Sequence, residues 1–318
     1  MKRFKNIMYV NDGRGIESES FIRAMTLADN NKARLKVVEV IEDVPSELLA
    51  LMRTKKIPDP KEIISITCTD TLTHMGAAAK NRGLDTSTRL LTGTPFIELI
   101  REVIRGKHDL VIMSPSAEEG LKEFFFGSTA MHMMRKCPCP VWVIKKQQKS
   151  KFAKILAAVD PPLSLNETDS VKTDLNKKIM ELSSSLARLE KSELHVVHTW
   201  ELYLETMLRN RAGLSQSDIN DMIEESKRNH VKMVNELIMT YSPGLPEKRI
   251  HILKGRAGYM IPEVAREIGI ELIVMGTVSR TGIAGLFIGN TAEEILGRVD
   301  CSVLTVKPDG FETPIHLQ

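Results

Sequence analysis

A glycine-rich segment in the last fifth of the chain has the residue types of an anion-binding loop. It spans residues 276–289 and contains four glycines, which let backbone N–H groups approach an anion closely. Asn290 or Thr291 then supplies a helix N-cap, and Thr291-x-x-Glu294 fits a capping box. The free N–H groups of that first helical turn favour an anion. The pattern predicts a phosphate site, although the same glycines would also suit a turn that only packs against a helix.

Two aspartates that follow apolar runs are the second kind of candidate. Asp12 comes after the run 7–10, and Asp160 comes after the run 155–159 and before two prolines. In an open parallel sheet, ligands bind beyond the carboxyl ends of the strands, at the point where the strand order reverses. Both aspartates occupy such ends if the runs are strands. Asp160-Pro-Pro would also serve as the start of a turn that binds nothing.

Several reactive side chains are interpreted as structural instead. The Cys137-Pro-Cys139 segment could bind a metal or carry redox chemistry, but Cys139 enters a buried-strand pattern and is therefore read as a structural thiol. His195 and His198 alternate with apolar residues and have no Glu or Cys at metal-binding spacing, which is typical of interior histidines. No metal ligand set is predicted.

Catalytic motifs are missing from the sequence. It contains no Gly-x4-Gly-Lys-(Ser/Thr) loop, no Gly-x-Ser-x-Gly elbow and no zinc-ligand pattern. No general base is placed beside a nucleophile, so no catalytic residue is assigned. The sequence favours a binding protein over an enzyme, with weak ATP hydrolysis left open.

The elements that must position these residues alternate between short apolar runs and amphipathic stretches. In the second half of the chain, strands are predicted at 155–159, 194–198, 248–253, 272–275 and 302–306, and helices at 170–191, 215–240, 258–268 and 291–298. Leu175, Ile179, Leu182, Leu186 and Leu189 line one face of the first of these helices. Strands that are apolar throughout are typical of a parallel sheet covered by helices on both faces.

The two halves of the chain repeat one another. Segments 109–115, 125–130 and 138–145 match segments 162 positions later, whereas the first strands match at an offset of 148. The second copy therefore carries 14 extra residues between its first and third strands. We expect them in the segment 201–227, as a cap over a ligand cleft. Its apolar side chains are Met207, Leu208, Leu214, Ile219, Met222 and Ile223.

Strand–helix alternation in both copies predicts an α/β protein with two tandem, doubly wound, open parallel five-stranded sheets. The expected domains are residues 1–147 and 152–310, joined by a polar basic linker and followed by a C-terminal tail, 311–318. Each copy ends in an apolar edge strand, and unpaired edges are normally covered. The two copies are therefore expected to pack as an intramolecular pseudo-dimer, and a homodimer is left open.

The glycine-rich loop resembles the Gly-x2-Gly-x9-Gly-(Ser/Thr) nucleotide motif of the universal stress protein (UspA) superfamily. The duplication resembles that of its tandem, UspE-type members, and the resemblance covers nearly the whole chain. Further marks are the aspartate after each first strand, Gly93-Thr-Pro, and a cysteine-containing turn before each last strand. The resemblance implies a Rossmann-like fold of the adenine nucleotide alpha hydrolase kind.

The resemblance also implies a nucleotide site in the second copy. It would comprise an aspartate at the ribose, backbone at the adenine and a loop at the phosphates: Asp160, Thr199, Gly276, Ser279, Arg280, Gly289, Asn290 and Thr291. Two positions depart from the family pattern. Ser279 stands where the family has its second glycine, and Asn290 stands where it has Ser or Thr.

The corresponding residues of the first copy predict a degenerate site. They are Asp12, Val40, Gly127 and Ser128. Ser114 and Ala117 replace the first two glycines of the motif, and three glutamates in the same loop would repel phosphate. Any nucleotide is therefore expected in the second copy.

Composition agrees with a cytoplasmic binding protein. The 318 residues include 44 Lys and Arg against 41 Asp and Glu, with opposite charges intermixed, which speaks against a dedicated nucleic-acid binder. The longest aliphatic runs are four or five residues, so neither a membrane span nor a signal peptide is predicted. Four scattered cysteines do not make a disulfide framework.

The leading interpretation is a stress-response protein that binds a small molecule and acts through ligand-dependent association. ATP or another adenine nucleotide is the expected ligand. No cofactor is required, and Mg²⁺ would enter only with a bound triphosphate. The alternatives are a ligand-independent tandem scaffold and a binder of a larger nucleotide-linked or acyl ligand.

Overall fold

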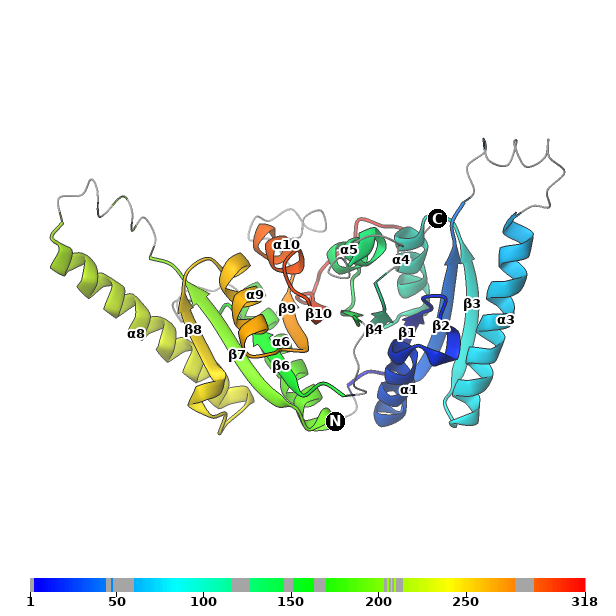
Figure 1. Ribbon diagram of the computed structural model, residues 1–318, viewed down its shortest axis with the longest axis horizontal. Helices are drawn as coiled ribbons and strands as arrows, with labels where there is room; N and C mark the ends of the chain where they lie inside the picture. Colours follow the sequence, from blue (N-terminus) through cyan, green and yellow to red (C-terminus); the bar gives the residue numbers. More distant parts are fainter. Residues whose placement is uncertain are drawn as a thin grey trace. The chain divides into compact units, whose positions relative to one another are not determined.

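The chain divides into two compact units that repeat one architecture (Figure 1). The computed structural model describes residues 3–43, 60–115, 126–145, 151–162, 170–202, 214–277 and 289–317, with the isolated positions 47, 205, 207 and 209. The first unit comprises residues 3–145 and the C-terminal segment 311–317. Among the described residues, the second unit comprises 151–277 and 289–310. No helix among the described residues is long and apolar enough to cross a membrane.

The first unit contains a parallel five-stranded sheet in the order β3-β2-β1-β4-β5. Its strands are β1 (Asn6–Val10), β2 (Arg34–Ile41), β3 (Thr86–Thr92), β4 (Leu110–Met113) and β5 (Val141–Val143). Its helices are the 3₁₀ turn η1 (Gly15–Glu17), α1 (Glu19–Asn31), α3 (Pro60–Asn81), α4 (Pro95–Gly106) and α5 (Gly127–Lys136). Right-handed crossovers in this order place α1 and α3 on one face of the sheet and α4 and α5 on the other.

The second unit repeats this order as β8-β7-β6-β9-β10, again with parallel strands. Its strands are β6 (Lys154–Ala158), β7 (Glu193–Trp200), β8 (Ile250–Lys254), β9 (Leu272–Gly276) and β10 (Ser302–Val306). Its helices are α6 (Ser170–Glu190), α8 (Gln216–Tyr241), the 3₁₀ turn η2 (Glu247–Arg249), α9 (Ala257–Glu267) and α10 (Asn290–Leu296). The predicted fold class of two five-stranded parallel sheets is confirmed. How the two copies pack together stays a prediction.

The cores follow the apolar patterns of the sequence. Every residue of β4 is buried, as are the first four of β9, because helices cover both faces of each sheet. Ile179 is 2% exposed, in line with its place on the apolar face of α6. Leu189 is 41% exposed, so the predicted face ends one turn early, near the C-terminus of the helix. Burying one such aliphatic side chain contributes about 1.5–3 kcal/mol.

The 14 extra residues of the second copy lie mainly in a different place from the one predicted. β1 and β2 begin 28 residues apart, whereas β6 and β7 begin 39 residues apart. Eleven of the extra residues therefore precede β7, where α6 has 21 residues against 13 in α1. The sheet registers place the other three between β7 and β8. The expectation of an insertion centred on 201–227 is wrong, because it came from an apolar stripe rather than from strand positions.

The proposed cap over 201–227 stays a prediction. Among its apolar residues, Ile219 is 2% exposed, whereas Met207, Leu214 and Met222 are each more than a third exposed. Leu208 lies outside the described residues. Helix α8 itself begins with a capping box between Ser215 and Asp218.

Candidate functional site

The candidate site of the second unit lies where its strand order reverses, between β6 and β9. Asp160 follows β6 by two residues, and Gly276 ends β9. Thr199 is the penultimate residue of the neighbouring strand β7. Because all strands are parallel, these residues share the carboxyl edge of the sheet, where open α/β sheets bind ligands. Ser279 and Arg280 lie outside the described residues.

Asp160 presents its carboxylate while its backbone is held in place. The Asn176 side chain of α6 accepts a hydrogen bond from the Asp160 N–H at 2.8 Å and donates one to the Asp160 carbonyl at 2.9 Å. The Asp160 side chain is 49% exposed, and Lys172 Nζ lies 3.6 Å from its Oδ2. A carboxylate fixed in this way can accept hydrogen bonds from a ligand's hydroxyl groups.

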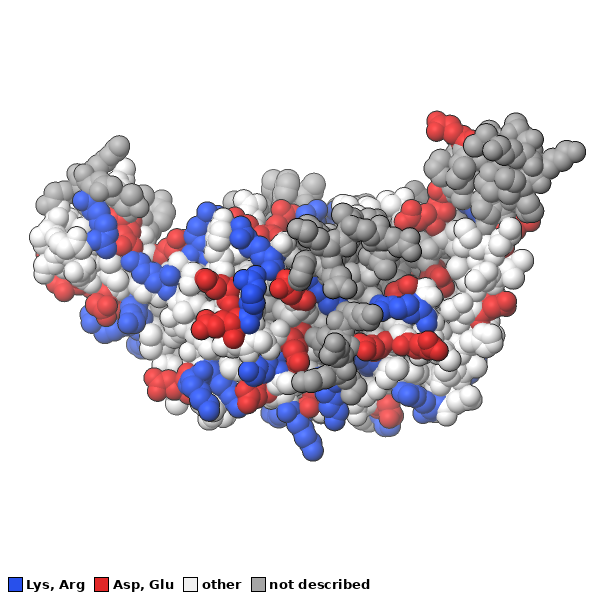
Figure 2. Space-filling view, viewed as in Figure 1, with Lys and Arg blue, Asp and Glu red and all other residues white. Residues whose placement is uncertain are grey.

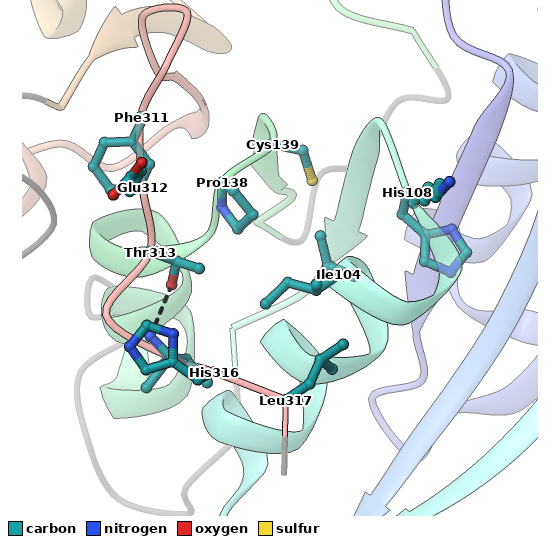
Figure 3. A pocket seen from close by; sticks show the side chains of 12 residues that line it. Ile104, His108, Pro138, Cys139, Phe311, Glu312, Thr313, His316 and Leu317 are labelled. Carbon is teal, nitrogen blue, oxygen red and sulfur yellow. Dashed lines mark hydrogen bonds between the residues drawn. The ribbon is translucent and has the colours of Figure 1, made fainter.

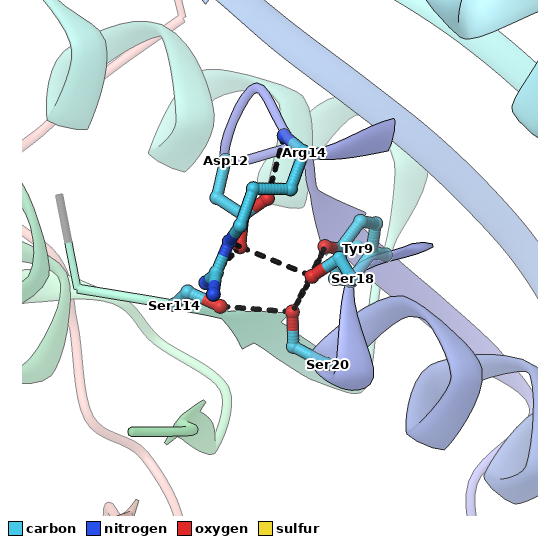
Figure 4. Close-up of polar contacts among 6 residues, drawn as sticks. All are labelled: Tyr9, Asp12, Arg14, Ser18, Ser20 and Ser114. Atoms are coloured by element: carbon cyan, nitrogen blue, oxygen red, sulfur yellow. Dashed lines mark hydrogen bonds and ion pairs between the residues drawn. The ribbon is translucent and has the colours of Figure 1, made fainter. Parts of the chain in front are cut away.

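The corresponding aspartate of the first unit is covered (Figure 4). Arg14 donates to Asp12 Oδ2 from Nη2 at 2.5 Å and from Nε at 3.0 Å, and the Asp12 side chain is only 7% exposed. Burial raises the pKa of Asp12, but the hydrogen bonds and the charge of Arg14 are among the effects that outweigh it, so this pKa is lowered overall. The carboxylate is therefore ionised and already neutralised by the chain's own guanidinium.

Hydroxyl groups fill the space beside Asp12. Ser114, which stands where the family motif has its first glycine, donates to Ser20 at 2.8 Å. Ser20 and Ser18 are 2.7 Å apart, and the Tyr9 hydroxyl lies 2.9 Å from Ser20 (Figure 4). Burial is the main reason that the pKa of Tyr9 is raised to about 12. These hydroxyl groups hydrogen-bond to one another, so side chains of the protein itself occupy the carboxyl edge of the sheet beside Asp12.

The other predicted residues of the first copy lie on the expected elements. Val40 is the next-to-last residue of β2 and is partly buried. Gly127 opens α5 with φ of +74°, a conformation that favours glycine, and Ser128 follows it exposed to solvent.

Gly276 has a packing reason to be glycine. A Cβ at this position would meet the end of the Leu175 side chain on α6, which would have to shift to make room. The alternative that this glycine serves helix packing therefore has structural support. Gly289 has an ordinary φ of −62°, so its backbone conformation does not require glycine.

The predicted start of the last helix is corrected by one or two residues. Helix α10 begins at Asn290, and its N-cap is Gly289 rather than Asn290 or Thr291. Glu294 pairs with Arg256 at 2.9 Å instead of reaching back to the helix start. The predicted capping box does not form, because the Glu294 side chain that would close it pairs with Arg256 instead. Asn290 and Thr291 are both exposed.

A buried histidine pair adjoins Asp160, and sequence reasoning missed it as a pair. His198 is 2% exposed; its Nδ1 lies 3.0 Å from the Val159 carbonyl, and its Nε2 lies 2.8 Å from His230 Nδ1. The His230 ring stacks on Trp200, with centroids 5.3 Å apart. Burial lowers the pKa of both histidines, and that of His230 falls to about 4. The sequence did carry a signal for this pair, because His230 falls on the same face of α8 as the buried residues Val234 and Ile238.

The prediction of interior histidines is confirmed for His198 and for His195, which is 6% exposed. His195 Nδ1 lies 3.1 Å from His251 Nε2 on the neighbouring strand. Burial also lowers the pKa of His195 and of His251. No group of three or more metal-binding side chains occurs within the described part of the chain.

A pocket of about 670 Å³ in the first unit lies away from the candidate sites (Figure 3). It is lined by the C-terminal end of α4, by Pro138 and Cys139 before β5, and by the segment 311–317. Arg101 Nε donates to the His316 carbonyl at 3.3 Å and holds this segment. Because α4 ends and β5 begins there, the pocket is at the amino edge of the sheet, opposite Asp12.

The thiols beside this pocket show no sign of reactivity. Cys137 Sγ and Cys139 Sγ are 3.6 Å apart, and both residues are buried. The hydrogen bond to Cys137, together with burial, holds the pKa of Cys139 well above its ordinary value. A thiol that keeps its proton is a poor nucleophile, which fits a structural role.

Basic and acidic side chains are interspersed over the visible face of the molecule (Figure 2). Many of them pair, as Lys178 does with Asp174 at 3.1 Å and with Asp309 at 2.5 Å. Local groups, rather than a broad field of one sign, therefore set the electrostatics of this face.

Comparison with known proteins identifies the family that this fold and this site edge define. The sequence model of the universal stress protein family matches residues 3–145 and again residues 151–307. The chain therefore belongs to the universal stress protein family and carries its domain twice.

Tandem relatives match over the whole length. The chain is 28% identical over 319 residues to universal stress protein E of Escherichia coli K12, covering 100% of this chain and 98% of that protein. It is 27% identical over 318 residues to universal stress protein E of Photorhabdus laumondii, covering 99% and 98%. A functionally unknown protein of Pseudomonas aeruginosa PAO1 shares the fold, with a TM-score of 0.71 at 23% identity over 98% of this chain and 95% of that chain. The chain is thus a tandem member of the family, similar to universal stress protein E.

Proposed function

We propose that this chain is a cytoplasmic stress-response protein whose second unit binds an adenine nucleotide such as ATP. The contrast between the two aspartates is the observation that carries the proposal. Asp160 stands at the strand-order reversal with a side chain that is 49% exposed, whereas Asp12 is 7% exposed and paired with Arg14. At this position the second unit presents the more exposed carboxylate, with Lys172 Nζ 3.6 Å away.

Each part of the ligand has a proposed partner. Asp160 accepts hydrogen bonds from the ribose hydroxyls, and the backbone at Thr199 meets the adenine. The loop that follows Gly276 and ends at Gly289 surrounds the phosphates, with Ser279, Arg280, Asn290 and Thr291 contributing. Mg²⁺ enters only with a triphosphate, and no other cofactor is needed. No catalytic residue is assigned, and the proposed mode of action is ligand-dependent association.

The first unit supports a different role from the second. Because Arg14 and the hydroxyls of Ser18, Ser20 and Ser114 occupy its site edge, this unit works without a ligand. It serves as a scaffold for the second unit. A ligand-independent tandem scaffold is accordingly the alternative for the whole chain.

Calorimetric titration of the full chain with ATP tests the proposal. The wild type should bind, and Asp160→Ala should weaken binding about tenfold or more, because a hydrogen bond to a charged group contributes about 1.5–3 kcal/mol. Asp12→Ala is the matched control and should bind ATP as the wild type does. Native mass spectrometry of the purified chain gives an independent check through a co-purifying nucleotide. Equal losses in the two variants, or no binding by the wild type, would refute the proposal.

A further inference from the structure

Each copy of the fold places a buried lysine just beyond its last strand. Lys307 follows β10 directly, and Lys145 occupies the same position of the repeat, 162 residues earlier. Both residues are only 5% exposed. Lysine is rarely so buried, because an ammonium loses its hydration there. The groups around each Nζ therefore indicate the role of the buried ammonium.

In the second unit the ammonium points to the edge of the candidate site. Lys307 Nζ donates a hydrogen bond to Thr277 Oγ1 at 2.5 Å. Thr277 directly follows Gly276, and Gly276 pairs with Val306 in the sheet register. Lys307 and Thr277 are therefore neighbours at the carboxyl edges of β10 and β9, at the start of the segment that would surround phosphate.

In the first unit the equivalent ammonium makes a different contact. Pro115 occupies the position of Thr277 and has no hydroxyl to accept a hydrogen bond. Lys145 Nζ lies 4.2 Å from the centroid of the Phe126 ring, a cation–π contact with a residue that is only 2% exposed. The charge is retained in both copies; Lys307 contacts a hydroxyl group beside the candidate site, whereas Lys145 contacts an aromatic ring.

We propose that Lys307, oriented by Thr277, is the phosphate-recognising cation of the second unit and makes its site selective for nucleoside di- and triphosphates over nucleosides. This inference rests on the proposed function. A lysine ammonium acts on phosphate as a compact point charge, and it acts more strongly where water is scarce. A polyphosphate chain reaching past Gly276 comes to the ammonium, whereas adenosine alone ends near Asp160.

A neighbouring lysine supplies a matched control. Lys178 Nζ donates to the Lys307 carbonyl at 3.2 Å, so it lies in the same region. Its charge is already compensated by Asp174 and Asp309, at 3.1 and 2.5 Å. Lys178→Met removes a nearby positive charge without removing the proposed contact. Lys145→Met is a second control, because it removes the equivalent buried lysine of the first unit.

The experiment is a calorimetric titration of the full chain with ATP, adenosine and inorganic tripolyphosphate. Lys307→Met should weaken ATP binding by about ten- to hundredfold, because one charge-assisted contact is lost, and should leave adenosine binding unchanged. Lys307→Arg should stay within a few-fold of the wild type. The two control variants should bind all three probes normally. Thermal unfolding of each variant establishes that it is folded.

The outcomes separate this inference from the proposed function. If the wild type binds ATP and Lys307→Met keeps the wild-type ratio of ATP to adenosine affinity, the inference is overturned and the proposed function stands. If the wild type binds no adenine nucleotide, the proposed function fails, and tripolyphosphate decides whether Lys307 marks an anion site. If Lys307→Met does not fold, Thr277→Val takes its place. Unchanged ATP binding by that variant also overturns the inference.

Discussion

His198 and His230 form a hydrogen-bonded pair in which both imidazoles are more than nine-tenths buried. The Val159 carbonyl can only accept a hydrogen bond, so His198 donates from Nδ1 and its Nε2 accepts a hydrogen bond from His230 Nδ1. Burial is the main reason that the pKa of His230 falls to about 4; repulsion from His198 adds to it, and Asp160 opposes it. Both rings are therefore neutral at neutral pH.

This pair predicts acid sensitivity of the second unit. An unfolded histidine has a pKa of about 6.5, so the unfolded chain takes up protons before the folded chain does as the pH falls. The stabilising contribution of neutral His230 is complete above about pH 6.5 and is lost as the pH falls towards 4. The free energy of unfolding should therefore decrease over this range.

Urea denaturation at a series of pH values measures the effect. His230→Gln keeps a donor to His198 but removes the titration, so it should reduce the proton uptake on unfolding by about one proton. Lys232→Met, an exposed substitution on the same helix that keeps both histidines, is the control. An unchanged pH dependence in His230→Gln would contradict the assignment.

At the scale of elements, one ion cluster fastens α4 to the sheet of the first unit. The Glu102 side chain is fully buried; Lys36 Nζ lies 2.5 Å from its Oε1, and Arg89 and Arg105 lie 2.8 and 3.1 Å from its Oε2. Burial raises the pKa of Glu102, but the three cations more than offset it, so the pKa is lowered. Lys36 is on β2 and Arg89 on β3, so a single carboxylate joins three elements.

Removing that carboxylate should therefore be costly. Glu102→Gln removes the charge that the three cations share and should lower the free energy of unfolding by about 1.5–3 kcal/mol, because the two arginines are more than a third exposed and can be hydrated. Glu98→Gln breaks a single pair with Arg101 on the same helix, in which the carboxylate is 19% exposed rather than fully buried, and should therefore cost less than Glu102→Gln. Chemical denaturation compares the two variants. Similar losses of unfolding free energy in the two variants would contradict a special contribution from the buried Glu102 cluster.

The contact between α6 and β9 predicts a compensating pair of substitutions. Gly276→Ala brings a Cβ against the end of the Leu175 side chain and should destabilise the second unit by about 1 kcal/mol, because Leu175 must shift. Adding Leu175→Ala should recover part of that loss. A double-mutant cycle by thermal unfolding gives the coupling energy, and additive effects would argue against the close approach.

At the scale of the whole molecule, duplication has produced two units with the same topology and different site edges. The proposed function predicts one nucleotide per chain. Gly289→Val should abolish binding because a branched side chain keeps a phosphate from the backbone, whereas Gly127→Val should leave binding nearly intact. Calorimetric stoichiometry and affinity measure both. Binding of two nucleotides per chain, or a loss only in Gly127→Val, would contradict the asymmetry.

The pseudo-dimer expected from the sequence is tested at the same scale. Small-angle scattering of the full chain should give one compact particle if the apolar edge strands of the two copies cover each other. Two bodies tumbling independently on the linker around residue 148 would contradict this expectation.

The sequence by itself determined the duplication, the parallel sheets and the positions of most strands and helices, because apolar runs and helical periodicity are local patterns. It also indicated Asp160, Thr199 and Gly276 at one sheet edge, since parallel strands end together. Only the tertiary structure decided how each edge is filled. Arg14 turns onto Asp12, Ser114 meets Ser20 across 94 residues, and Leu175 approaches Gly276 across about a hundred. The pairing of His198 with His230 and of Lys307 with Thr277 is also tertiary. Such contacts depend on how side chains from different elements pack, and no local period encodes that packing.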